Sequence, residues 1–547
     1  MFAETQLQIQ QDPCMSSVNN FVTNFHKLVH VGIALSSQKN LENLLEEILI
    51  SAIDITNCDS GTLYLMTQAN ELQCEILVVK SLNIKEGGSS GKTIEIPNKP
   101  LYHRDGSPNF FIEATQAVHE NRTINVPNAY KELHFDMVSP SQADELRGYK
   151  STSFLTTPMQ DHEGEIIGVL QLINAKDPET NQIIPFTSED EEVLEALASQ
   201  AAIAFSNRLL IFRLENLFKE FIDLINGAID DKSPYTGAHC RRVPELTSMI
   251  ADAVNNNDKG PLKDFKMTDA DRYELHIAGL IHDCGKVSTP VHIVDKATKL
   301  EKIYDRIGVL ELRLEIIRRD LEIAFLKGKC SEEDWKKMEH QLIDDIQFLK
   351  ESNVGSEWMS DLSIRRINQI AKSHQWQDYL NNSHDFITAE EVENLSIRSG
   401  TLNVLDRKII NHHIEVTIDM LENLTWPKHL QRVPEYAGGH HERMDGRGYP
   451  KGLTRDEMSV QARCMAIADV FEALTASDRP YKKGKKLSEA LMILGKMKLD
   501  QHLDPDIFNV FVWGKVYEQY AKKFLKVEQI DFIDVSQIPG YEAPPLE

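Results

Sequence analysis

Two adjacent histidines open a glycine-rich turn in the stretch His440-His441-Glu442-Arg443-Met444-Asp445-Gly446-Arg447-Gly448-Tyr449-Pro450. An imidazole costs free energy to bury unless its ring nitrogens find partners. Gly446, Gly448 and Pro450 predict a sharp turn directly after the histidine pair. Two histidines at the edge of a rigid turn are candidate metal ligands, and Glu442 is expected to orient one of them.

Further histidines and acids of the same kind are spread along the chain on both sides of this turn. Taken singly, each histidine is more often a hydrogen-bonded structural residue than a metal ligand. The ordered set is far more specific, and histidine combined with carboxylate suits divalent metals such as iron or manganese. The candidate ligands are His239, His282, Asp283, His413, His440, His441 and Asp469.

This ordered set resembles the HD-GYP family of cyclic dinucleotide phosphodiesterases, part of the wider HD metal-dependent phosphohydrolases. The two signatures are His282-Asp283 and Gly448-Tyr449-Pro450. Flanking matches are Lys286, the run Ala473-Leu474-Thr475 and the run Arg479-Pro480-Tyr481. The resemblance implies an all-α domain that hydrolyses cyclic di-GMP to the linear dinucleotide pGpG, and onward to GMP.

The resemblance also implies how the ligands divide between two metal ions, which the sequence itself does not do. Two metals at ~3.5–4 Å can clamp a phosphodiester and hold a bridging hydroxide for in-line attack on phosphorus. Asp283 would bridge the two ions. The first ion would lie among His239, His282, Asp283 and Asp469, and the second among Asp283, His413, His440 and His441.

Two positions in this pattern require a choice. Of His412 and His413, His413 reproduces the family spacing to Leu421, so we choose His413. Part of the family holds a third metal through an acid one helical turn before the first histidine. Tyr235 occupies that place here, and tyrosine is a poor ligand for such a site. We therefore predict two metal ions.

Basic residues near the candidate ligands are predicted to contact the substrate. Lys286 is expected to reach a phosphate oxygen or to assist the leaving group, beside Asp283 as the other catalytic residue. Arg479 and Lys482 are predicted substrate contacts, because residues 482–486 are locally basic in an acidic chain. A solvated surface is the alternative for the end of that run.

Three alternatives to cyclic di-GMP hydrolysis stay open. The preference for guanine over adenine rests on the resemblance, so cyclic GMP-AMP is an alternative substrate. The domain could instead be a non-catalytic cyclic dinucleotide receptor or scaffold, although the complete ligand set argues against this. A phosphohydrolase for ordinary nucleotides is the third alternative, which the extended turn disfavours.

Length and composition limit the class of protein. The 547 residues predict two or three domains. The net charge of −25 disfavours nucleic acid polymers and acidic membranes, whereas bound metals can still attract a small anion. No apolar run reaches the ~20 residues of a membrane helix, and the polar start lacks a signal pattern, so we expect a cytoplasmic protein without membrane insertion. Seven dispersed cysteines argue against a disulfide framework.

The N-terminal part has a mixed α/β pattern. Residues 1–20 are polar and predict a flexible arm, and residues 21–205 predict an α+β domain. This order resembles a GAF domain, a sensor with a central antiparallel sheet, and implies an unknown small molecule as its ligand. The predicted elements are a helix over 41–55 and strands over 62–66, 72–82, 153–159 and 166–173.

One run in this domain resembles the signature of cyclic-nucleotide-binding GAF domains. It comprises Leu172–Asp177 and Phe186–Glu191, preceded by Asn125–Tyr130. Ala175 stands where that signature has a lysine. The alternative, which we favour, is that these residues fasten the last strand to the last helix.

A long helix is predicted over residues 188–229, which are almost free of glycine and proline. Its apolar stripe is expected either to make a homodimer contact or to serve as a rigid spacer packed on its neighbours.

The HD-GYP-like domain is predicted over residues 230–528, with an insertion over 300–396. A heptad pattern that begins at Leu300 predicts an antiparallel helical hairpin turning near Gly328. Residues 529–547 contain two proline-rich sites and predict a tail.

Overall fold

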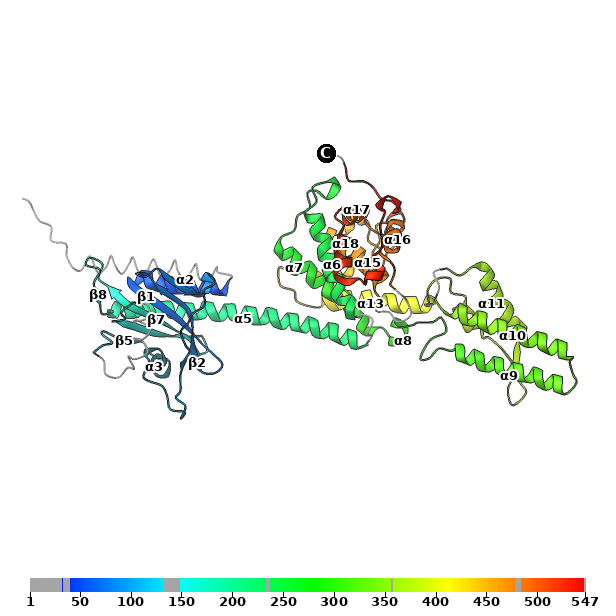
Figure 1. The fold of residues 1–547 in the computed structure, drawn as a ribbon, viewed down its shortest axis with the longest axis horizontal. Helices are drawn as coiled ribbons and strands as arrows, with labels where there is room; N and C mark the ends of the chain where they lie inside the picture. Colours follow the sequence, from blue (N-terminus) through cyan, green and yellow to red (C-terminus); the bar gives the residue numbers. More distant parts are fainter. Residues whose placement is uncertain are drawn as a thin grey trace, which may run out of the picture. The chain divides into compact units, whose positions relative to one another are not determined.

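The computed structural model describes residue 32 and residues 40–131, 148–232, 237–355, 358–477 and 484–545. The chain forms two compact units, residues 1–218 and 219–547 (Figure 1). Helix α5 (Ser188–Lys232) belongs to both, because the boundary falls within it. The predicted flexible arm, Tyr235, Arg479 and Lys482 lie outside the described residues.

The first unit is built on an antiparallel sheet with strand order β3-β2-β1-β7-β6-β5. Short strand β4 also pairs with β2, and β8 pairs with β7. This confirms the predicted α+β unit with an antiparallel sheet. Its elements are α2 (Leu41–Ile55), β1 (Cys58–Met66), β2 (Glu71–Val79), β3 (Ile84–Gly87), β4 (Lys99–Pro100), α3 (Glu113–Glu120), β5 (Ile124–Val126), β6 (Phe154–Gln160), β7 (Ile166–Lys176) and β8 (Ile183–Ile184).

The main core of this unit lies between one face of the sheet, α2 and the first turns of α5. Leu45 and Ile48 of α2 and Leu197 of α5 belong to one buried cluster. Helix α2 packs so closely on β1 that a Cβ on Gly61 would lie 2.7 Å from Leu49. The glycine therefore permits the close approach of helix and strand.

The residues of the cyclic-nucleotide-like signature make structural contacts. Asn174, at φ +61°, accepts a hydrogen bond from the Thr152 amide at 2.7 Å. Lys176 pairs with the buried carboxylate of Asp59. Asn125 donates to the Phe186 carbonyl at 3.1 Å, just before α5. These contacts support the interpretation that the signature fastens the last strands to the last helix.

The second unit is predominantly helical, as predicted. Thr268, Asn403 and Ser459 cap α7, α13 and α15, each accepting a hydrogen bond from the amide three residues later. Helix α6 packs against α7 and α15, and α13 packs against α14 and the 3₁₀ segment η3. The elements of this unit that precede and follow the insertion in the sequence are α6 (Gly237–Asn255), α7 (Asp269–Ile281), η3 (Cys284–Ser288), α8 (Val291–Val294), α13 (Val404–Glu422), α14 (Val433–Gly438), α15 (Val460–Thr475), α16 (Leu487–Leu499), α17 (Pro505–Trp513) and α18 (Val516–Phe524).

The insertion contains the predicted helical hairpin and has a core of its own. Leu314 and Leu342 are buried in that core, and Gly328, at φ +69°, lies in the turn. The heptad pattern was expected to begin at Leu300, but α9 begins only at Ile307. The insertion also holds a small sheet and two further helices that the sequence did not predict. Its elements are α9 (Ile307–Leu326), α10 (Glu332–Asn353), α11 (Asp361–Ser373), β9 (Gln375–Gln377), β10 (Ser383–Asp385) and α12 (Ala389–Leu395).

Lys299 lies at the base of the insertion and is fully buried. Its Nζ donates a hydrogen bond to the Leu395 carbonyl at 3.0 Å and lies 3.8 Å from the sulfur of Met359. Burial lowers the pKa of Lys299 to about 8, because the apolar surroundings disfavour the charged ammonium.

The C-terminal segment that was predicted to be a tail is packed on the domain. Ile538 is buried, and the Glu542 carboxylate accepts a hydrogen bond from Lys498 at 3.0 Å. Trp513 donates to the Glu542 carbonyl at 2.7 Å.

Among the described helices, none combines the length and the apolar character needed to cross a membrane.

Candidate metal and substrate site

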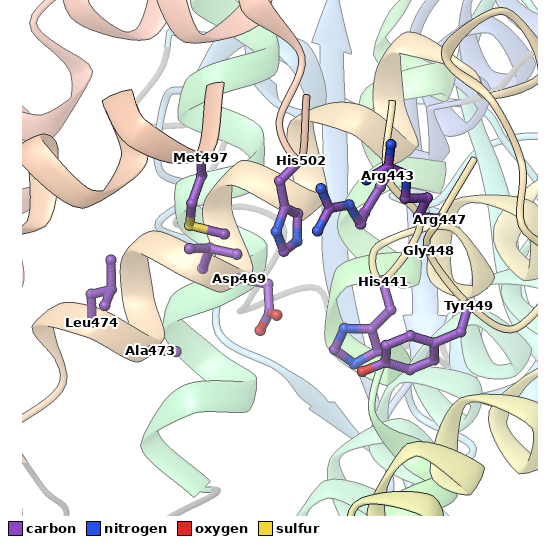
Figure 2. A pocket seen from close by; sticks show the side chains of 11 residues that line it. His441, Arg443, Arg447, Gly448, Tyr449, Asp469, Ala473, Leu474, Met497 and His502 are labelled. Atoms are coloured by element: carbon purple, nitrogen blue, oxygen red, sulfur yellow. The ribbon is translucent and has the colours of Figure 1, made fainter. Parts of the chain in front are cut away.

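The second unit contains a cavity of about 540 Å³ beside the histidine-rich turn (Figure 2). His441 and Asp469 line it, together with apolar side chains of α15 and α16 and the basic side chains of two arginines. The cavity therefore brings two of the predicted ligands to a space that a small molecule can enter. It is lined by His441, Arg443, Arg447, Gly448, Tyr449, Asp469, Val470, Ala473, Leu474, Met497 and His502.

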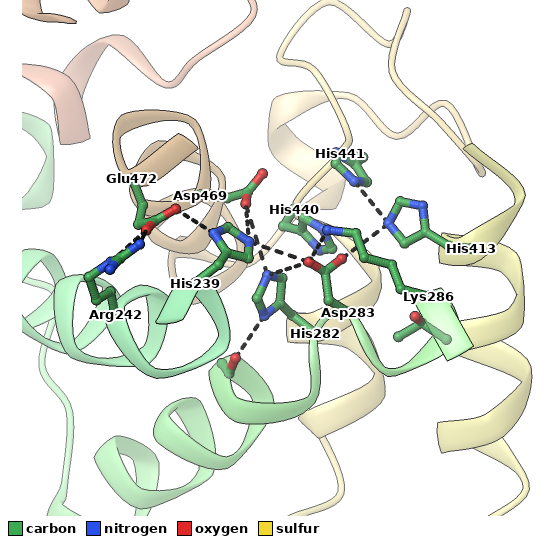
Figure 3. Close-up of polar contacts among 12 residues, drawn as sticks. His239, Arg242, His282, Asp283, Lys286, His413, His440, His441, Asp469 and Glu472 are labelled. Carbon is green, nitrogen blue, oxygen red and sulfur yellow. Dashed lines mark hydrogen bonds and ion pairs between the residues drawn. The ribbon is translucent and has the colours of Figure 1, made fainter. Parts of the chain in front are cut away.

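The predicted ligands come from five places in the chain and meet beside this cavity (Figure 3). The ligand atoms of six of the seven form two groups, and within each group these atoms all lie within 4.8 Å of one another. Asp283 belongs to both groups. The first group is His239, His282 and Asp283, and the second is Asp283, His413, His440 and His441.

Three of the histidines are held in the same way. The Nδ1 atoms of His282, His413 and His440 lie 2.7, 2.5 and 2.6 Å from the backbone carbonyl three residues earlier. These contacts place the proton on Nδ1 and leave the Nε2 lone pair directed at the centre of the cluster. Metal-binding histidines are typically oriented by such a second hydrogen bond.

The centre of the cluster contains buried polar atoms that form no hydrogen bond to the described residues. They are Nε2 of His282, Nε2 of His440 and Oδ1 of Asp283. Buried polar atoms are nearly always partnered. His413 Nε2 and Asp283 Oδ1, both acceptors when Nδ1 carries the proton, face each other at 3.2 Å. A cation between such atoms would satisfy both, so the donor set fits divalent metals.

Asp469 lies beside the first group, and His441 contacts His413 within the second. Asp469 Oδ1 lies 3.2 Å from Nε2 of His239 and 3.9 Å from Nε2 of His282. His441 Nε2 lies 3.2 Å from Nε2 of His413. His412, by contrast, is exposed and contacts Glu415, away from the cluster.

The electrostatic environment favours the metal-binding forms of His440 and Asp283. Burial, followed by repulsion from His282, lowers the pKa of His440 to about 4, so its imidazole is neutral at pH 7. Burial alone would raise the pKa of Asp283. Lys286 and His282 outweigh burial and hold that pKa well below its usual range. For His239, burial would lower the pKa, but contacts with Asp283, Asp469 and Glu472 outweigh it and raise the pKa well above its usual value.

Lys286 lies directly beside the shared carboxylate, because its Nζ contacts Asp283 Oδ2. Desolvation would lower the pKa of Lys286, but Asp283 and Asp469 raise it above its usual value. The side chain is therefore a positively charged donor at the edge of the cluster, as expected for a group that contacts phosphate.

Segment η3, which carries Lys286, lies in backbone contact with α13. The Gly285 amide donates to Thr417 Oγ1 at 2.9 Å, and a Cβ on Gly285 would lie 2.0 Å from the His413 carbonyl. Lys232, at the end of α5, donates to the carbonyl of Val287 and lies 3.4 Å from that of Lys286. The position of η3 is thus set from both sides.

A carboxylate and an arginine behind His239 were not predicted from the sequence. Nδ1 of His239 lies 2.5 Å from the Glu472 carboxylate, which also accepts a hydrogen bond from Arg242 at 2.7 Å. Glu472 is fully buried. The sequence contains a signal that would have found it, because Glu472 lies one turn after Asp469 on the same helix.

We expected Glu442 to orient a histidine, but it binds backbone amides instead. Its buried carboxylate accepts hydrogen bonds from the amides of Lys451, Gly452 and Leu453 at 2.8, 3.1 and 2.9 Å. It therefore closes the glycine-rich turn. Tyr449 contacts a ligand instead, because its ring stacks on His441 with centroids 4.9 Å apart.

Several residues that line the cavity were not predicted from the sequence. The Arg447 side chain is 80% exposed and can reorient toward a ligand. Met497 and His502 come from the region of α16, about 50 residues beyond the turn, and no motif marks them. Only the fold brings them to the site.

Comparison with known families agrees with this architecture. Residues 40–205 match the GAF domain model, and residues 236–350 and 379–507 match two HD domain models. The chain therefore carries a GAF domain followed by an HD domain whose two matched parts are separated within the insertion. An HD domain implies divalent metal binding.

Three similar proteins are named as phosphodiesterases of cyclic dinucleotides. A 3′3′-cGAMP-specific phosphodiesterase 3 of Vibrio cholerae is 25% identical over 54% of this chain and 39% of that protein. A cyclic di-GMP phosphodiesterase of Pseudomonas aeruginosa is 48% identical over 13% of this chain and 17% of its own length. A cyclic di-GMP phosphodiesterase of Thermotoga maritima is 27% identical over 38% of this chain and 54% of its own length.

Each of these matches spans less than two thirds of the relative's length. Together with the domain matches, they confirm the predicted resemblance: an N-terminal GAF domain joined to an HD domain that is related to cyclic dinucleotide phosphodiesterases.

Proposed function

We propose that this protein is a metal-dependent phosphodiesterase that hydrolyses cyclic di-GMP to linear pGpG, with GMP as a further product. The observation that carries the proposal is the pair of ligand groups that share Asp283 beside the cavity. A small molecule that binds the GAF domain would regulate the reaction, and the protein would act as a homodimer. Nucleic acid polymers are not proposed as partners, given the net charge of −25.

Two divalent ions, iron in preference to manganese, are the proposed cofactors. Asp283 would be shared between them, and when bound they would supply Lewis acidity and activation of water. His239, His282 and Asp469 would hold one ion, and His413, His440 and His441 the other.

The chain's own residues position the reacting groups. In the hydrolysis, a water oxygen forms a bond to phosphorus, the bond from phosphorus to the 3′ oxygen breaks, and a proton passes to that oxygen. Lys286, whose Nζ lies beside Asp283, would contact a phosphate oxygen and assist this leaving group. Glu472 would hold His239 in position.

Arg479 and Lys482 are the further substrate contacts that we propose. Ala473 and Leu474 line the cavity near the end of α15, a few residues before these two cations in the sequence. A basic side chain at this edge would offset the charge of the second phosphate.

Cyclic GMP-AMP is the second candidate substrate. Two relatives from Vibrio cholerae are named 3′3′-cGAMP-specific phosphodiesterases, and they are 25% and 36% identical over 54% and 24% of this chain. Selection between the two substrates would depend on contacts to the second base in the cavity.

The first test is metal content combined with turnover, on protein purified without oxygen so that reduced iron is retained. We expect about two metal ions per chain and a linear product from cyclic di-GMP. Cyclic GMP-AMP and ordinary nucleotides would be assayed in parallel to identify the preferred substrate. Full metal loading without hydrolysis of any cyclic dinucleotide would overturn the enzyme proposal and favour a receptor. Three metals per chain would contradict the argument from Tyr235.

A further inference from the structure

Two arginines of the glycine-rich turn line the cavity, and they differ in how fully their donors are used. Arg443 contacts both carboxylate oxygens of Asp445, at 3.2 and 3.1 Å, and the Asp500 carboxylate at 3.0 Å. For Arg447, only the side-chain Nε approaches Asp445, at 3.6 Å, and its two terminal nitrogens form no hydrogen bond to a described residue. The cavity therefore has one arginine that is held by carboxylates and one whose donors are available to a ligand.

The backbone that carries Arg447 is fixed, although its side chain is free. Its amide donates a hydrogen bond to Asp445 at 3.0 Å. Gly446, at φ +75°, precedes it, and a Cβ on the following Gly448 would lie 2.4 Å from the Arg443 nitrogen. The turn is therefore tightly folded, and it presents the guanidinium of Arg447 to the cavity from a defined position.

A substrate bound at the metal ligands would bring a base into the part of the cavity that Arg447 lines. In the proposed reaction, a phosphate would lie beside His441 and Asp469, which line the same cavity. Each base of a dinucleotide is joined to its phosphate through a single sugar. The apolar side chains of the cavity would cover the face of such a base, which leaves its edge for polar groups to recognise. These apolar side chains are Val470, Ala473, Leu474 and Met497.

We propose that Arg447 selects guanine by donating two hydrogen bonds to the edge of one substrate base. This inference rests on the proposed binding and hydrolysis of a cyclic dinucleotide. Guanine carries two acceptors, N7 and O6, on the edge that fits a guanidinium, whereas adenine carries one acceptor and an amino donor there. Arginine has only donors, so an adenine at this place would set a donor against a donor.

The proposal predicts an asymmetric reaction with cyclic GMP-AMP. This ring can enter the cavity in two orientations, which place either guanine or adenine at Arg447 and bring a different phosphate to the metal ligands. Arg447 would favour the orientation that places guanine beside it. One of the two phosphodiester bonds would therefore be cleaved in preference, and one of the linear isomers pGpA and pApG would dominate.

Exchange of Arg447 for glutamine tests the proposal, because a glutamine amide matches N6 and N7 of adenine. The values of kcat/KM for cyclic di-GMP and cyclic di-AMP would be compared on the metal-loaded full chain. We expect the wild type to prefer cyclic di-GMP and Arg447→Gln to reduce that preference on the order of 10–100-fold. Lys451→Gln is the matched control and should keep the wild-type preference, because Lys451 is a cation of the same turn whose Nζ lies 3.4 Å from Glu422. An unchanged preference in Arg447→Gln would overturn the proposal.

The products of cyclic GMP-AMP give a second readout that does not depend on the overall rate. We expect one linear isomer in about tenfold excess from the wild type and a lost or reversed excess from Arg447→Gln. Equal amounts of the two isomers from the wild type would overturn the proposal. If no cyclic dinucleotide is hydrolysed, the proposed function fails by itself. The calorimetric affinities for cyclic di-GMP and cyclic di-AMP, compared between wild type and Arg447→Gln, would then decide the role of Arg447.

Discussion

At the residue scale, Asp283 is the carboxylate that both ligand groups share. We expect Asp283→Ala to lose both metals and to lower turnover on the order of 10³-fold, because Lys286 and two sets of histidines then lack their common partner. Elemental analysis and hydrolysis would be measured on the same sample. Asp320→Ala, on α9, is the control and should change neither. An active Asp283→Ala variant with full metal content would contradict the assignment.

Glu472 acts on a predicted ligand without being one. Glu472→Gln keeps a hydrogen-bond partner for His239 but removes the negative charge that Arg242 and the imidazole share. We expect metal affinity to fall about 10–100-fold. Calorimetric titration of the metal-free protein with manganese would measure this independently of activity. An unchanged affinity would mean that Glu472 has only a packing role.

Lys299 is predicted to reduce stability at neutral pH. Its pKa in the folded chain is about 8, below the ordinary value, so the buried charge is fully present below pH 8 and is lost as the pH rises. Lys299→Met should therefore be more stable at pH 7, on the order of 2 kcal/mol, and the difference should shrink by pH 10. Thermal unfolding of both proteins at the two pH values would measure it; equal differences would refute the explanation.

The candidate ligands could be predicted because their order along the chain, and no single histidine, matches a family pattern. The structure brings all seven together, although they span 230 residues of sequence between His239 and Asp469. Met497 and His502 could not be predicted, because they enter the cavity only through the packing of α16. Glu442 was assigned the wrong partner, because spacing alone cannot distinguish a histidine from the amides that a turn brings nearby.

At the scale of the element, η3 depends on close contact with α13. A Cβ at Gly285 would overlap the His413 carbonyl, so Gly285→Ala must separate the two segments. We expect a loss of about 1–3 kcal/mol in unfolding free energy and weaker metal binding. Gly308→Ala is the control, since nothing lies within 4 Å of its Cβ position in α9. Equal stability of the two variants in denaturant titrations would show that η3 can shift freely.

Elements set by local periodicity were predicted well, and elements set by distant pairing were not. Helix α2 has the predicted bounds, because its apolar residues recur at helical spacing. Strand β1 begins at Cys58, four residues before the predicted start, because Cys58 and Ser60 pair with β7. The start of α9 was misplaced because Leu300 continues the heptad spacing but is buried ahead of the helix.

At the scale of the whole molecule, the two units should respond differently to metal. Ligands that bind only the folded state raise its stability. The predicted ligands all lie in residues 219–547, so a chelator should lower the melting temperature of that unit alone. We expect calorimetry to resolve two transitions, of which only one shifts when metal is removed. Asp283→Ala should show no shift, and a shift of both transitions would contradict the prediction.

The hydrogen bond from Lys232 to the Val287 carbonyl has a consequence for how the two domains share information. It joins the last residue of α5 to the segment that carries Lys286. Thermodynamic linkage is reciprocal. If a sensor ligand changes substrate affinity by moving α5, then substrate must change the affinity of the sensor for its ligand by the same factor. Under that proposal, the GAF domain would respond to the ligand of the cavity as well as influence its binding.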